Sequence, residues 1–312
     1  MNVFSPNDEI DVLVTCYPHS DRIAIFPQVR GFYLAQHLAR AGLRAEFRQL
    51  PLPGFKCKVL ICSEYQSDMQ WFEGRLAGPL SEIRADRWFC LVDASLRGHT
   101  DDFSYEVCQW FASRGGVLCH LNDDELEPYE HWVGLGVDAE VVRPAVDGRR
   151  NHVLFDFPRS SSVDTASTFQ VSTLDVLRQT MPDYRLIGCG PADAAVRHAF
   201  DGWIEYGQPH SAFVGAAFAG VLAVVPGRSE SMGMAHAEAQ VAGACVVASA
   251  DQVPKQILVP EATVTYEAGN GESLARALAL ATTRDPARIR EQALQHFNFA
   301  DVIARTRAAI RL

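Results

Sequence analysis

The sequence predicts an α/β protein that folds as two domains, each built on its own doubly wound parallel sheet. Short apolar runs alternate with amphipathic stretches along most of the chain, and this rhythm is typical of βαβ units. It is interrupted at 142–148, VRPAVDG, after which the same alternation begins again. A chain of 312 residues also has the length of about two ordinary domains.

The first half contains the elements of one such sheet. Apolar runs predict strands at 11–16, 44–50, 58–62, 88–92, 117–121 and 139–143. Apolar residues at helical spacing predict helices at 31–41, in the stretch that ends at 80, at 102–114 and near 125–135. Residues 17–30 are expected to form a long loop before the first helix. Gly42 and the pair Gly115-Gly116 mark helix ends, because glycine readily takes the left-handed conformation found there.

The second half repeats the pattern. Strands are predicted at 153–157, 184–187, 203–206, 221–225, 245–248 and 263–266. Helices are predicted at 165–180, at 209–219, from 233 until Gly243 stops the helix, at 272–282, and once or twice in the tail 285–312. We therefore expect an N-terminal domain at 1–147, a second domain at 148–295, and a C-terminal helix at 296–312 that can return to the first domain.

The composition indicates an ordinary globular protein of a reducing compartment, which we expect to be cytoplasmic. Hydrophobic residues make up 48% of the chain, yet no apolar run approaches the ~20 residues of a membrane-spanning helix. The first residues lack the basic region of a secretory signal. The eight cysteines are scattered, several of them in apolar runs, so we expect small buried residues and no zinc site. A net charge of −10 disfavours a broad nucleic-acid surface but leaves room for a local basic cleft.

The stretch 221–250 has the pattern strand, polar loop, short helix, strand. A helix that begins at Gly233 points its free N–H groups and the positive end of its dipole toward the loop, which suits a phosphate group. Glu230 lies in the loop, and Glu238 lies in the helix, from which it can reach a sugar hydroxyl of the same ligand. The pattern also fits an ordinary βαβ unit with solvent-facing carboxylates, so this stretch alone does not decide.

Segments around this stretch resemble, in order, the motifs of a known family. Residues 228–249 resemble the pattern E-x-F-G-x4-E-A-x-A-x-G-x-P-V-V-A-S, residues 186–191 resemble L-x-I-x-G-x-G-P, and residues 203–207 resemble V-x-F-x-G. These motifs are those of the retaining GT-B glycosyltransferases with a Glu-x7-Glu signature, the family 4-like glycosyl transferases of group 1. The resemblance covers about 150–312, and in the first half it is limited to Gly31 and the helix that follows.

The resemblance implies a fold and a reaction. The fold would be GT-B, with two Rossmann-like domains that face a cleft. The reaction would move a sugar from a UDP- or GDP-sugar to an acceptor hydroxyl with retention of configuration. The nucleotide sugar is then a co-substrate, and no further cofactor is expected. Such enzymes usually need no metal, because helix ends and basic side chains balance the charge of the leaving diphosphate.

The resemblance also assigns residues. The implied donor-binding set is Glu238, Gly188, Gly190, Arg159, Ser231, Met232, Gly233, Met234 and Gly31. Glu238 would bind the ribose of the nucleotide, and Glu230 would lie beside the transferred sugar. The N–H groups of 231–234 would hold sugar hydroxyls or the diphosphate. Gly31 would let the backbone approach the diphosphate.

Two positions depart from the family pattern. The family has an arginine and, five residues later, a lysine after the first strand of its second domain. Arg159 fits the arginine, but Asp164 holds the lysine position. Arg228 and Lys255 are the cations that could replace the missing lysine.

The second departure concerns the first domain. The family's His-Asp pair is Val92-Asp93 here, so the usual histidine is missing. His120, at the end of the next predicted strand, is the candidate substitute, and with Glu230 and Asp93 it completes the catalytic set that we infer. A buried or merely polar role for His120, and a helix-cap or loop role for Asp93, are the alternatives.

The acceptor and two other functions are left open. The acceptor can be a small molecule, a lipid-linked glycan, or a hydroxymethylated base, as in phage-type DNA glycosyltransferases. A non-catalytic GT-B-like module that binds a nucleotide or glycan is favoured by the missing lysine and histidine, and a sugar-nucleotide epimerase is the third alternative. Neither a GxSxG nucleophile elbow nor a GxxxxGK[ST] phosphate loop occurs in the sequence. The oligomeric state is not predicted.

Overall fold

The structure of the chain is a computed structural model. It describes residues 5, 8–18, 26–64, 68–93, 104–121, 126–144, 150–157, 173–190, 194–205, 208–226, 233–249 and 253–312. Contacts divide the chain into two compact units: unit 1 comprises Met1–Gly136 and Asn298–Leu312, and unit 2 comprises Val137–Phe297. The boundaries predicted from the sequence were 147 and 295.

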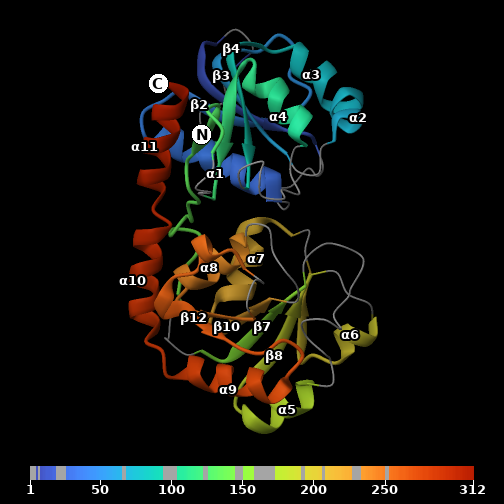
Figure 1. The fold of residues 1–312 in the computed structure, drawn as a ribbon, viewed down its shortest axis with the longest axis vertical. Helices are drawn as coiled ribbons and strands as arrows, with labels where there is room; N and C mark the ends of the chain where they lie inside the picture. The colour runs from blue at the N-terminus through green and yellow to red at the C-terminus, as the bar shows by residue number, and fades with distance from the viewer. Residues whose placement is uncertain are drawn as a thin grey trace. The chain divides into compact units, whose positions relative to one another are not determined.

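Unit 1 is built on a six-stranded parallel sheet (Figure 1). Its strands are β1 (Ile10–Cys16), β2 (Ala45–Gln49), β3 (Lys56–Ser63), β4 (Arg84–Val92), β5 (Gly115–Cys119) and β6 (Glu130–Trp132). They lie in the order β2-β1-β3-β4-β5-β6, and every neighbouring pair is parallel. The central strands are near-continuous apolar runs, because a parallel sheet is covered on both faces. The first five strands confirm the sequence prediction.

Helices cover both faces of this sheet. They are α1 (Phe26–Arg40), α2 (Met69–Phe72), the π-helix η1 (Glu73–Ala77), α3 (Gly78–Ser81), α4 (Tyr105–Ala112) and α11 (Phe299–Ile310). One apolar cluster packs Leu13 of β1 with Phe72 and Phe111. The cluster on the other face packs Leu38 of α1 with Ile303 of the C-terminal helix α11. Side chains from the last part of the chain therefore help to cover one face of the unit 1 sheet.

Two sequence predictions in unit 1, and one at the beginning of unit 2, were wrong. Helix α1 begins at Phe26, inside the predicted loop 17–30, and proline at the second residue is compatible with a first helical turn. Residues 130–132 form strand β6 where a helix was predicted, because their backbone pairs with the open edge of β5. The predicted strand 139–143 is a turn, since Asp138 accepts hydrogen bonds from the N–H groups of the three residues that start at Glu140.

Unit 2 also has a six-stranded parallel sheet. Its strands are β7 (His152–Asp156), β8 (Arg185–Cys189), β9 (Gly202–Ile204), β10 (Val221–Pro226), β11 (Cys245–Ala248) and β12 (Thr263–Thr265). They lie in the order β12-β11-β10-β7-β8-β9. The chain winds in one direction from β7 to β9, and then returns past β7 to continue from β10 to β12. This reversal between β7 and β10 is the topological switch point of the sheet.

The helices of unit 2 are α5 (Thr173–Thr180), α6 (Ala194–His198), α7 (His210–Phe218), α8 (Met234–Val241), α9 (Gly271–Thr282) and α10 (Pro286–His296), with short 3-10 turns η2 (Lys255–Ile257) and η3 (Pro260–Ala262). Helix α8 packs against β10, β11 and α10, and α9 packs against α5 and the strands β10 to β12. The prediction of a helix between Gly233 and Gly243 is confirmed. In the described part of the chain, no helix has the length and apolar character to cross a membrane.

The eight cysteines behave as small core residues. All of them are buried and none forms a disulfide. Burial raises the pKa of Cys57 to about 12 and that of Cys245 to about 11, so both remain thiols at neutral pH. This confirms the expectation that they fill the cores.

Candidate functional site

The switch point of unit 2 lies where the sequence placed the phosphate-binding loop. In open parallel sheets, ligands bind beyond the carboxyl ends of the strands at such a point. Strand β7 ends at Asp156 and β10 ends at Pro226, and the connection from β10 to α8 leaves from this edge. Several predicted site residues lie outside the described residues: Arg159, Arg228, Glu230, Ser231 and Met232. The described residues at the two ends of the loop fix where it starts and where it returns.

The loop returns at Gly233, which starts helix α8. Gly233 has a left-handed backbone (φ 71°), a conformation that favours glycine, and it is the N-cap of α8. No side chain among the described residues caps this end of the helix. A helix start of this kind can bind an anion, and this is the role predicted for the N–H groups of 231–234. Lys255 is exposed on η2, which packs against α8.

Glu238 is buried on α8 rather than facing solvent. It is only 5% exposed, and its Oε1 lies 2.7 Å from Nε2 of His210, the first residue of α7. Burial by itself lowers the pKa of His210, but the carboxylates of Glu238 and Asp138 outweigh it, so that pKa is raised above its usual range. The solvent-facing alternative for this carboxylate is therefore wrong, and the sequence contained no signal for its histidine partner.

A second buried histidine lies beside the end of β7. His236, in the first turn of α8, is fully buried, and its Nε2 lies 3.9 Å from Oδ2 of Asp156. The thiol of Cys189 donates to Oδ1 of the same carboxylate at 3.4 Å. Neither ring nitrogen of His236 has a hydrogen-bond partner within the part of the chain that the structure describes. Burial lowers the pKa of His236, although Asp156 acts in the opposite direction, so the ring is neutral at pH 7.

Two predicted site glycines, one in β8 and one just after it, pack against a tryptophan of the neighbouring strand β9. A Cβ at Gly188 would lie 2.1 Å from Cζ3 of Trp203. The carbonyl of Gly190, a residue with a left-handed φ of 100°, accepts a hydrogen bond from Nε1 of Trp203 at 3.0 Å. Phe157 stacks on the same ring, with centroids 5.7 Å apart. These two glycines therefore have a packing role at this edge, beside the nucleotide-binding role implied by the resemblance.

We expect Gly188→Ala to destabilise the protein by about 1–3 kcal/mol, because the added methyl group must displace the Trp203 ring. The matched control is Gly215→Ala in α7, where a Cβ would meet no atom within 4 Å. That variant should be as stable as the parent, or more stable by up to about 1 kcal/mol, because alanine is the better helix former. Urea unfolding followed by circular dichroism compares the two, and equal stabilities would contradict the packing argument.

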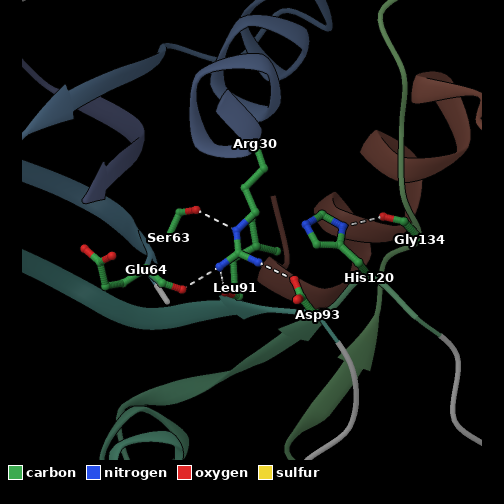
Figure 2. A network of polar contacts seen from close by, with 7 residues as sticks. All are labelled: Arg30, Ser63, Glu64, Leu91, Asp93, His120 and Gly134. Atoms are coloured by element: carbon green, nitrogen blue, oxygen red, sulfur yellow. Dashed lines mark hydrogen bonds and ion pairs between the residues drawn. The ribbon is translucent and has the colours of Figure 1, made fainter. Parts of the chain in front are cut away.

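The carboxyl edge of unit 1 is held by one arginine that the sequence had placed in a loop. Arg30 of α1 is 1% exposed, and Figure 2 shows its guanidinium among groups from β3 and β4. It donates to Ser63 Oγ at 2.9 Å, to the Glu64 carbonyl at 2.6 Å and to the Leu91 carbonyl at 2.7 Å. It also forms an ion pair of 2.8 Å with Oδ1 of Asp93. These bonds join the helix to the ends of two central strands.

Asp93 is therefore one half of a buried ion pair, with a side chain that is 4% exposed. His120 lies close by in Figure 2, and its Nδ1 is 2.9 Å from the carbonyl of Gly134. Because a carbonyl only accepts, Nδ1 carries the proton and Nε2 carries the lone pair. Burial, together with the charge of Arg30, lowers the pKa of His120 to about 3. So low a basicity makes His120 a weak general base near neutral pH.

Gly31 has a packing role within unit 1, whatever its role at the diphosphate. It lies within α1, after the first turn of the helix. A Cβ at this position would lie 3.0 Å from the ring of Phe47 and 3.3 Å from Cβ of Ser63. Close packing of α1 on β2 and β3 accounts for the glycine.

Two hollows of about 500 Å³ each open at the other end of the unit 1 sheet, where β3 and β4 begin. They share Asp86 and Trp88 in their linings, and no residue of the predicted site lines either of them. Asp93, His120 and Gly190 of the predicted site lie instead at the carboxyl ends of strands, the edge at which open parallel sheets bind ligands.

No protein-family model matches the sequence, and no curated protein matches it at a significant level. Solved structures similar to the chain include HepE of Anabaena in complex with UDP and glucose, with a TM-score of 0.64 and 12% identity over 97% of this chain and 99% of that one. Sucrose-phosphate synthase from Thermosynechococcus elongatus has a TM-score of 0.62 and 13% identity over 96% and 98%. A glycosyltransferase from Rickettsia africae has a TM-score of 0.61 and 10% identity over 97% of this chain and 98% of that one. At these identities the likeness establishes the fold alone, and the chain has the GT-B fold with two Rossmann-like units.

Proposed function

We propose that the protein is a glycosyltransferase that moves a sugar from a nucleotide-sugar donor, a UDP- or GDP-sugar, to an acceptor hydroxyl with retention of configuration. One observation carries the proposal. The loop that holds Glu230 leaves from the switch point of the unit 2 sheet and returns at the start of α8, the helix of Glu238, where no described side chain forms a cap. The similarity to glycosyltransferases, one of them solved with UDP and glucose, supports it.

In the proposed reaction the bond between sugar C1 and the diphosphate oxygen breaks, and the acceptor oxygen bonds to C1 on the same face. The acceptor proton passes to the leaving diphosphate. The protein then supplies orientation and charge stabilisation rather than a dedicated base. We assign the negative charge that develops on the diphosphate to the N–H groups at the start of α8. Arg159 matches the family's arginine, and Arg228 and Lys255 are the candidate cations that replace its lysine.

We assign the acceptor to unit 1 and the donor to unit 2. The ion pair of Asp93 with Arg30 and the low basicity of His120 support a positioning role for both predicted residues. In this role they hold the carboxyl ends of β4 and β5 in place, and the loops that follow these strands contact the acceptor. Small molecules, glycans and modified DNA remain the candidate acceptors.

Thermal unfolding in the presence of UDP, GDP, UDP-glucose, UDP-N-acetylglucosamine and GDP-mannose tests the donor assignment. A nucleotide supplied at one hundred times its Kd should stabilise the folded protein by about 2.7 kcal/mol. The nucleotide that raises the Tm names the base, and a larger rise with one of its sugars names the sugar. No response to any compound in the panel would overturn the donor site.

Turnover is tested with Glu230→Ala. We expect this variant to keep its Tm. Its rate of sugar transfer, and its slower rate of donor hydrolysis, should both fall by about a hundredfold or more, because a contact at the reacting sugar is removed. The matched control is Glu272→Ala, on an exposed carboxylate of α9 that is 83% exposed, and it should be fully active. If the wild-type protein binds a donor but transfers its sugar to no class of acceptor, this result would favour the non-catalytic module. Epimerisation of the donor without an acceptor would favour the epimerase.

A further inference from the structure

The buried carboxylate of Glu238 has a partner that the donor-site motif does not include. His210 reaches it from another helix, at the first position of α7, with 2.7 Å between Nε2 and Oε1. The two residues are 28 positions apart in the sequence, and α7 packs directly against α8. Asp138, from the beginning of unit 2, lies close enough for its charge to act on His210 as well.

Such a partner is physically necessary. A carboxylate taken out of water is costly unless a donor or a cation compensates it. Ribose hydroxyls are neutral donors, and they are present only when a nucleotide is bound. An imidazole that donates to Oε1 compensates the carboxylate in both states. It also fixes the rotation of the carboxylate, and this rotation decides where the second oxygen, Oε2, points.

The place of His210 in the fold supports a specific role. A positive charge at the start of a helix opposes the helix dipole, so α7 alone disfavours the protonated form of a histidine at its first position. The carboxylates of Glu238 and Asp138 supply that reason, because they more than offset the effect of burial on the protonated ring. The packing of α7 against α8 therefore places the Nε2–H donor of His210 beside the buried carboxylate of Glu238.

We propose that His210 is the positioning residue of the nucleotide site: its Nε2–H orients Glu238 so that the carboxylate accepts hydrogen bonds from the ribose 2′- and 3′-hydroxyls of a nucleoside diphosphate. This inference rests on the proposed function, in which Glu238 binds the ribose. His210 does not touch the ligand. It acts through Glu238, and it makes the site selective for ribonucleotides over 2′-deoxyribonucleotides.

The experiment compares two pairs of nucleotides, UDP with 2′-deoxy-UDP and GDP with 2′-deoxy-GDP, by isothermal titration calorimetry on the full chain. Two polar, uncharged substitutions are matched. His210→Gln carries an amide N–H at about the reach of Nε2, whereas His210→Asn is too short to reach Glu238. We expect the ribo-over-deoxy preference to fall about tenfold in His210→Asn, the worth of one charged hydrogen bond. It should stay within about threefold of the parent in His210→Gln. The 2′-deoxy forms keep the 3′-hydroxyl, so in His210→Asn their affinity should fall, but by less than that of the ribonucleotides.

The exposed His198 of α6 provides a control, because His198→Asn should leave the preference unchanged. A wild-type protein that prefers the ribonucleotide, with the same preference in His210→Asn and His210→Gln, would overturn the positioning role and leave the proposed function intact. A loss of affinity that is equal for ribo and deoxy forms would also overturn it, since it would indicate a merely structural residue. A wild-type protein that binds neither UDP nor GDP would overturn both proposals.

Discussion

Arg30→Met should destabilise unit 1 by about 3–5 kcal/mol, because it leaves the buried carboxylate of Asp93 without its cation. The substitution also removes the donors for Ser63 Oγ and for two strand-end carbonyls. Buried acceptors without partners bear the full cost of their desolvation. A loss of this size is a large fraction of the 5–15 kcal/mol that stabilises a typical domain.

Tryptophan fluorescence during urea unfolding measures this effect, since four of the five tryptophans belong to unit 1. The control on the same helix is Arg40→Met, at an exposed position, which should change the stability by less than about 0.5 kcal/mol. The double variant Arg30→Met with Asp93→Leu should lose less than the sum of the single losses, because it leaves no unpaired charge. A loss below about 1 kcal/mol in Arg30→Met would contradict the structural role of the pair.

Acid should destabilise unit 1 through His120. Burial and the charge of Arg30 lower its folded-state pKa to about 3, whereas an unfolded chain has an ordinary histidine pKa of about 6.5. Between these two values the unfolded chain binds a proton that the folded protein does not bind, so the stability falls as the pH drops below about 6.5. The loss from this residue is about 2 kcal/mol at pH 5 and about 3 kcal/mol at pH 4, relative to pH 7.

Urea midpoints from pH 7 to pH 4 test this in the wild type and in His120→Asn, which keeps an amide donor for the Gly134 carbonyl but cannot be protonated. The variant should lack that part of the acid loss, whatever its stability at pH 7. The buried histidines His152 and His236, whose pKa values burial also lowers, are present in both proteins and cancel in the comparison. Parallel pH profiles for the two proteins would show that His120 is protonated without cost.

The sequence predicted the sheets because their strands are buried on both faces and stand out as apolar runs between glycines. Helix α8 was predicted for a similar reason, since Gly233 and Gly243 enclose it. Periodicity failed where long-range pairing decides the structure. Strand β6 has three residues and exists because β5 offers it an edge, and a helical pattern over the same residues carries no information about that edge.

The candidate site was predicted only as far as local motifs reach. Glu238 and the start of α8 follow from one contiguous stretch. Arg30 looked like a loop residue because its acceptors come from β3 and β4, between 33 and 63 residues further along the chain. The partnership of His210 with Glu238 likewise depends on how two helices pack. Charge pairs of this kind form only in the tertiary structure, so no local sequence pattern predicts them.

The C-terminal helix α11 packs into the core of unit 1, although in the sequence the whole of unit 2 separates this helix from the other residues of that core. Unit 2 is one continuous segment, whereas unit 1 needs Ile303 and Ile310 from the last part of the chain to cover one face of its sheet. During synthesis on the ribosome, domains fold as their segments emerge. We therefore expect unit 2 to complete its folding before unit 1, although unit 1 is made first, because the sheet face that α1 covers still lacks α11 at that stage.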